Sequence, residues 1–93
     1  MTKSELIDKI ADANGKLTRY ESEKIVNIVF DSMVEALRNG EKVEIRGFGS
    51  LTVRERIARE ARNPKSGEIV NIPAKKMPFF KTGKELRKRV DNL

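Results

Sequence analysis

The side chains of this sequence that could do chemistry are mostly basic, and they gather in its second half. Residues 54–93 carry 12 lysines and arginines against 5 acidic residues, whereas residues 1–53 carry 8 against 9. Ammonium and guanidinium groups bind phosphate through their charge and their N–H donors. With a net charge of +6 and a pI near 9.8, the chain is predicted to bind a polyanion or an acidic membrane surface. The alternative is a merely soluble basic surface.

Most catalytic chemistry is excluded by composition. The sequence contains no cysteine, histidine or tryptophan, which removes disulfides, thiol nucleophiles, Cys/His metal sites and the commonest general base. We therefore expect no enzyme, no metal, no cofactor and no small-molecule substrate. The N-terminus lacks the apolar core of a signal peptide, and no stretch approaches the ~18 apolar residues of a membrane span. A cytoplasmic protein outside the membrane is expected.

Two helices are predicted from their boundary signals. The runs Thr2-Lys3-Ser4-Glu5 and Thr18-Arg19-Tyr20-Glu21 match the capping box, in which a Thr hydroxyl and a Glu carboxylate bind each other's backbone amides. The first helix should run from about Lys3 to Ala13 and end at Asn14-Gly15. The second should continue to a left-handed cap at Asn39-Gly40.

The second helix is too apolar for a monomer of this size. Nine of the thirteen residues 25–37 are apolar, and Asn27, Asp31 and Glu35 form a single narrow polar stripe. A second subunit is the expected cover, and the alternative is a monomer whose own sheet wraps the helix. We expect the dimer core to contain Ile25, Ile28, Val29, Met33, Phe48 and Phe79.

After the second helix, apolar and polar residues alternate as in half-buried strands, and beyond residue 53 this apolar side disappears. Val43 and Ile45, and later Leu51 and Val53, alternate with polar residues on either side of the turn Gly47-Phe48-Gly49. From Arg54 to Arg62 only Ile57 is a sizeable apolar residue. We expect a sheet body over 41–53 and 76–81, and a projecting hairpin arm over 54–75.

The arm should turn at Asn63-Pro64-Lys65-Ser66-Gly67, since these residue types favour turns. A third capping signal, Thr82-Gly83-Lys84-Glu85, predicts a short C-terminal helix over 82–91, with Leu86 and Val90 on one side.

Three strings of the sequence resemble the HU and integration host factor family of bacterial nucleoid proteins. They are EIRGFGSL at 44–51, ARNPKSGE at 61–68 and IPAKKMPFFKTGKELRKRV at 72–90, and the match covers essentially the whole chain. The first string is most similar to the β subunit of integration host factor, whereas residues 73–90 are equally similar to HU. Ala61 stands where the family usually has Gly. The subtype therefore stays open.

The resemblance implies an α+β fold and a histone-like, DNA-bending function. Residues 1–93 would form a single domain within an intertwined dimer, with 1–40 as the helical dimerisation part and two β-ribbon arms embracing duplex DNA in the nucleoid. The partner would be an identical or a related chain. Pro64 would intercalate at the arm tip, and Arg62 and Asn63 would lie in the minor groove.

Arg46 on the outward face would reach the minor groove or a phosphate, unless it merely pairs with Glu44 across the strand. Other cations would contact phosphates and give affinity without sequence preference; these are Arg54, Arg56, Arg59, Lys65, Lys75, Lys76, Lys81, Lys84 and Arg87. The alternative function is a basic RNA-binding or ribosome-associated protein. It is less well supported, because one Tyr and four Phe leave few aromatic platforms for unstacked bases.

Overall fold

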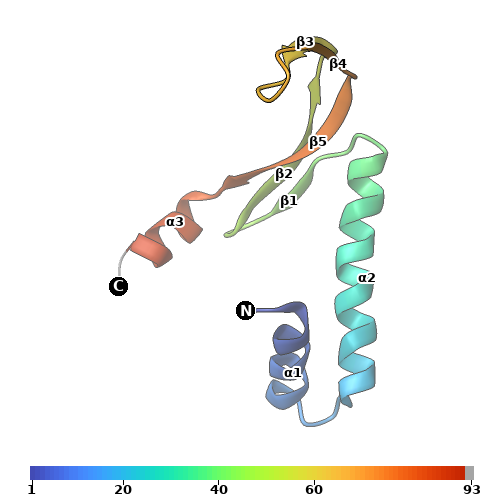
Figure 1. Cartoon of the computed structure of the whole chain (residues 1–93). Coiled ribbons are helices and arrows are strands. Elements are labelled where there is room, and N and C mark those ends of the chain that lie inside the picture. The colour runs from blue at the N-terminus through green and yellow to red at the C-terminus, as the bar shows by residue number, and fades with distance from the viewer. Residues whose placement is uncertain (92–93) are drawn as a thin grey trace. The chain divides into compact units, whose positions relative to one another are not determined.

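The computed structural model describes residues 1–91 and divides the chain into two compact units, one over residues 1–35 and the other from residue 36 onward (Figure 1). The first unit holds α1 (Lys3–Ala13) and most of α2 (Arg19–Arg38). The predicted starts of both helices are confirmed. The Thr2 hydroxyl accepts a hydrogen bond from the Glu5 amide at 3.1 Å.

The cap of α2 is a complete capping box. The Glu21 amide donates to Thr18 Oγ1 at 3.1 Å, and the Thr18 amide donates to Glu21 Oε1 at 3.0 Å. These contacts with the Thr18 backbone and hydroxyl lower the pKa of Glu21. At the other end of α2, Gly40 has a φ of 76° and completes the predicted left-handed cap. Its amide donates a hydrogen bond to Leu37 O, and the Glu41 amide donates one to Ala36 O.

The two helices bury little of their surface. Ile7 of α1 and Val26 of α2 are buried, and fully buried Ser22 donates its hydroxyl proton to Thr18 O. Arg19 links the helices, because its Nε donates to Asp8 Oδ1 at 2.7 Å and its Nη2 donates to Ser4 Oγ at 3.0 Å. No helix among residues 1–91 is long and apolar enough to cross a membrane.

The second unit contains a three-stranded antiparallel sheet in the order β1 (Val43–Ile45), β2 (Gly49–Arg56), β5 (Lys75–Thr82). The Phe48 amide bonds Ile45 O at 3.0 Å across the β1–β2 turn, and Gly47 has the positive φ of 83° that a type II turn needs at its third residue. β5 is an edge strand, with Pro78 in its middle opposite Val53.

Gly49 is needed for a different reason from Gly47. It is the first residue of β2 and its φ is not positive. A Cβ atom there would lie 2.6 Å from the Phe80 ring and 2.6 Å from Lys81 O. The expected turn Gly47-Phe48-Gly49 therefore combines one glycine for backbone conformation with another for the close approach of β5.

The arm forms a separate two-stranded sheet of β3 (Arg59–Arg62) and β4 (Ile69–Ile72), beyond the far end of the β2–β5 ladder (Figure 1). That ladder continues past Val53, since Arg56 still pairs with Lys75. Residues 57–58 and 73–74 then separate the two sheets.

The last helix, α3 (Lys84–Asp91), begins later than its capping signal predicts. Thr82 is the last residue of β5, pairs with Gly49 and lies one residue before the cap position. Instead Gly83 O accepts the first helical hydrogen bond, from the Arg87 amide, while the Gly83 amide donates to Phe48 O. The expectation of a third Thr–Glu capping box is wrong, whereas the α+β class is confirmed.

Candidate nucleic-acid interface

The tip of the arm is a loop organised by Asn63. The Asn63 amide donates to Glu68 O at 2.7 Å, and Asn63 O accepts from the Gly67 amide at 2.8 Å. Its side-chain Oδ1 accepts from the Lys65 amide at 2.9 Å, which forms an Asx turn around Pro64. The apolar Pro64 ring is thus held exposed at the extremity of the hairpin.

The residues around Pro64 differ in how they are held. The side-chain oxygen of Asn63, Oδ1, accepts a hydrogen bond from within the loop and so helps to hold the tip. Arg62, which ends β3 opposite Ile69, is exposed. Lys65 is also exposed and follows Pro64 directly. Along the chain, the exposed ring thus lies between two exposed cations.

The three-stranded sheet has two chemically different faces, because successive side chains along a strand point to opposite sides. The register places five apolar residues on one side, here called the apolar face: Val43, Ile45, Leu51, Val53 and Phe80. The other side, here called the cationic face, carries Arg54, Arg56, Lys75, Lys81, Thr52, Met77 and Phe79. Glu44 is the acidic residue that shares this second side.

The register also sorts the expected phosphate ligands. Arg54, Arg56, Lys75 and Lys81 meet on the cationic face, whereas Lys76 pairs with Glu55 on the opposite side. Lys76 is therefore not brought together with the others. Arg46 lies in the β1–β2 turn and is exposed.

A small hollow lies where the body sheet meets the arm. Its volume is about 170 Å³, and Arg56, Arg59 and Lys75 line it together with Ile57, Ile72, Pro73 and Met77. Three cations from three different strands thus surround one opening. The expected ligand Arg59 lies here rather than on the cationic face.

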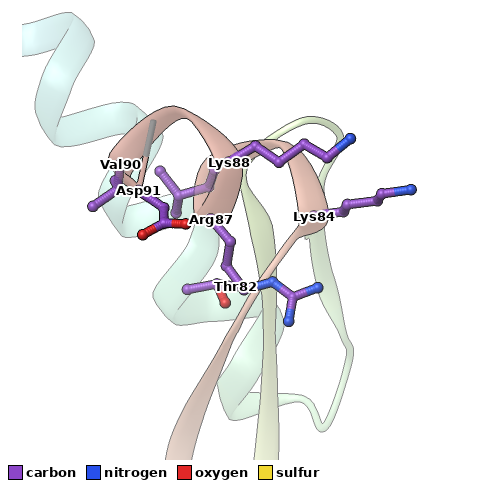
Figure 2. Close-up of a pocket in the computed structure, with 7 residues that line it drawn as sticks. Thr82, Lys84, Arg87, Lys88, Val90 and Asp91 are labelled. Carbon is purple, nitrogen blue, oxygen red and sulfur yellow. The ribbon is translucent and has the colours of Figure 1, made fainter. Parts of the chain in front are cut away.

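An open hollow of about 800 Å³ lies along α3 and is lined by Thr82, Lys84, Leu86, Arg87, Lys88, Val90 and Asp91. Figure 2 shows the Lys84 and Lys88 side chains extending to the same side, while Arg87 lies beside Thr82. Lys88 is absent from the expected ligands. The four-residue spacing from Lys84 is the signal that could have identified it, since such residues share a helix face.

The expected core residues fall into two groups. Ile25, Ile28 and Val29 of α2 lie on one side of the helix and are 42%, 64% and 51% exposed, and Met33 is half-buried. Phe48 contacts Phe80, with ring centroids 5.5 Å apart. Phe79 lies on the cationic face instead. The alternation of β5 places Phe80 on the apolar face and Phe79 on the other side of the strand.

Comparisons with known proteins agree with this geometry. The family model described as "Bacterial DNA-binding protein" matches residues 1–91. Anabaena HU, in a cocrystal structure with DNA, is 40% identical with a TM-score of 0.85, and the match covers 97% of each chain. HU from Thermotoga maritima is 30% identical with a TM-score of 0.65, over 97% of this chain and 98% of that one.

A mutant of transcription factor 1 is 31% identical with a TM-score of 0.65, over 100% of this chain and 93% of the other. Proteins of this family are structural DNA-binding proteins rather than enzymes. The match of the family model over residues 1–91, together with the agreement in fold and identity, shows that the chain belongs to the HU family of bacterial DNA-binding proteins.

Proposed function

We propose that this chain acts as a dimer that bends duplex DNA, with each arm inserting Pro64 between base pairs from the minor groove. The observation that carries the proposal is the arm tip, where hydrogen bonds of Asn63 hold an exposed proline ring between Arg62 and Lys65. A rigid apolar ring opens a base step, and guanidinium donors suit the acceptor-rich floor of an A·T-rich groove.

Unstacking a base step costs about a few kcal/mol, so a wedge needs compensating contacts elsewhere. The cationic face, the arm base and α3 supply these contacts as phosphate ligands, with Arg54, Arg56, Arg59, Lys75, Lys81, Lys84, Lys88 and Arg87 as members. Such contacts carry little sequence information. A bent duplex would meet more of these cations than a straight one, which is how bending is stabilised. The work of the protein would be to organise DNA in the nucleoid.

The dimer is supported by the apolar surface that one chain leaves uncovered. Ile28 and Val29 of α2 are more than half exposed, and the apolar face of the sheet contains Ile45 and Phe80 at 40% and 39% exposure. Large apolar surfaces of this kind usually mark subunit contacts. A second copy or a related chain would cover them, as in closed symmetric dimers.

The proposal is tested with the purified chain alone. Its mass in solution is measured first. Binding is then compared in one gel on an intact duplex, on the same duplex with a nick, and on duplex RNA of equal length. Bending is followed by energy transfer between dyes at the two ends of the intact duplex.

A dimer that binds the nicked duplex most tightly, binds RNA weakly and raises energy transfer supports the proposal, because a nick lowers the cost of the kink. Equal affinity for RNA would favour the alternative RNA-binding function. A folded monomer, or tight binding without a change in energy transfer, would refute the dimeric bending mechanism.

A further inference from the structure

The cationic face contains an aromatic side chain, Phe79, that has no role in the proposed DNA binding. Phe79 is 37% exposed and lies directly opposite Thr52, among Arg54, Met77 and Lys81. Its neighbour Phe80 is similarly exposed, at 39%, but contacts Phe48 on the apolar face. Two adjacent phenylalanines therefore serve opposite sides of the same strand.

The Phe79 ring supports a guanidinium group. Arg54 Cζ lies 3.4 Å from the centroid of the Phe79 ring. At that separation the guanidinium plane must lie flat on the ring, since a nitrogen pointed at the ring would come too close to its carbons. Arg54 is the diagonal neighbour of Phe79, because Thr52 pairs with Phe79 and Arg54 pairs with Met77.

Stacking of this kind leaves the binding groups of the arginine free. The five N–H donors of a guanidinium lie in its plane, so a ring against its face occupies none of them. No hydrogen bond or ion pair of the Arg54 guanidinium accompanies the ring contact within the part of the chain that the structure describes. The ring therefore restricts an otherwise long and freely rotating side chain without using its donors.

We infer that Phe79 is a positioning residue of the DNA-binding surface, which holds Arg54 ready to contact a phosphate of the duplex. The inference rests on the proposed function, in which the cationic face meets the DNA backbone. It gives the body of the protein one fixed phosphate contact beside the arm base. Phe79 acts through Arg54 and stabilises neither the fold nor the dimer.

The test is a double-mutant cycle on duplex DNA at fixed salt, read by fluorescence anisotropy. Phe79→Ala should weaken binding about two- to fivefold, the range of an exposed cation–π contact. Phe79→Tyr should restore the parental affinity, since it keeps the ring. In an Arg54→Ala background, Phe79→Ala should change the affinity by less than about 1.5-fold, because the arginine it positions is gone.

Two further readouts separate positioning from a structural role. Phe79→Ala should keep the melting temperature and the salt dependence of binding, whereas Arg54→Ala should flatten the salt slope by about 0.9 for each phosphate that it no longer neutralises. The matched control is Phe80→Ala, which removes the same side chain from the apolar face and should lower the melting temperature markedly.

Equal losses from Phe79→Ala with and without Arg54, or parental affinity in Phe79→Ala, would overturn the inference. So would a fall in melting temperature as large as that of Phe80→Ala. If the parent protein itself neither binds nor bends duplex DNA, the proposed function fails and the inference falls with it. A parent that bends DNA while the cycle shows no coupling removes the inference alone.

Discussion

Asn63 and Pro64 have separate tasks at the tip of the arm. Asn63 closes the loop through its amide, its carbonyl and its side-chain Oδ1, while Pro64 makes none of the hydrogen bonds that hold the tip. Replacing Pro64 therefore changes what the tip presents without removing what holds the tip together. The wedge can be removed while the loop remains.

Pro64→Ala should lower the bend angle more clearly than it lowers affinity. Without the wedge, the protein avoids the cost of unstacking but also forgoes the extra phosphates that a bent duplex would bring to it, and these two effects nearly offset each other. The loss of bending should shrink on nicked DNA, where the kink costs little. Energy transfer across a labelled duplex measures the bend, with thermal melting as the control for the fold. Parental bending of intact duplex by folded Pro64→Ala would exclude the wedge.

Gly49→Ala should destabilise the sheet body. The new methyl group would lie 2.6 Å from both the Phe80 ring and Lys81 O, and the latter is backbone that cannot move without disturbing β5. Overpacking of this kind costs about 1–3 kcal/mol, which lowers the melting temperature by several degrees.

The matched control is Gly15→Ala, because Gly15 has no atom within 4 Å of an added Cβ and no positive φ. It should melt at or slightly above the parental temperature. A Gly49→Ala variant as stable as Gly15→Ala would show that β5 does not approach β2 closely at Gly49.

At the scale of elements, α2 carries apolar side chains around most of its surface and buries few of them within its own chain. Val29→Asp should abolish folding and dimerisation together, because a charge would be placed without a partner in the proposed subunit contact at a cost on the order of several kcal/mol. Circular dichroism and solution mass measure the two effects.

Asn27→Asp is the control, since it places the same carboxylate on the polar stripe of the same helix. It should leave fold and mass unchanged. A folded, soluble monomer from Val29→Asp would argue against a core shared between subunits.

The sequence predicts where helices and strands lie better than it predicts which side of the sheet each side chain occupies. Helix starts follow from Thr2 and Thr18, whose partners are three residues away, and the ends follow from local turn chemistry. The side occupied by Phe79 depends on its register against β2, which aromatic composition does not reveal. Thr82 matches a cap locally, but the helix begins one residue later, with Gly83 at the cap position. Arg54 on Phe79 is likewise a cross-strand contact that requires the pairing to be known.

For the molecule as a whole, affinity for duplex DNA should fall steeply with salt. The basic half carries a net charge of +7 over residues 54–93, and each phosphate it neutralises contributes a slope of roughly −0.9. Removing Lys84 and Arg87 together should flatten the slope by about 0.9 for each phosphate left without a cation and leave sequence preference unchanged. Titrations at several salt concentrations measure both.

Lys9 and Lys16, which lie outside the basic half, provide the matched pair, and their joint replacement should keep the parental slope. A parental slope near zero would mean that the basic half does not face phosphate.

The position of Pro78 in β5 affects how readily copies of the chain aggregate at high concentration. β5 is an edge strand, and an unpaired edge is a template on which other copies can add strands and aggregate. Proline removes one donor from the middle of that edge, and Lys75, Lys76 and Lys81 add mutually repelling charge along it. The exposed apolar surface of the chain is thus accompanied by a strand edge that disfavours the addition of further strands.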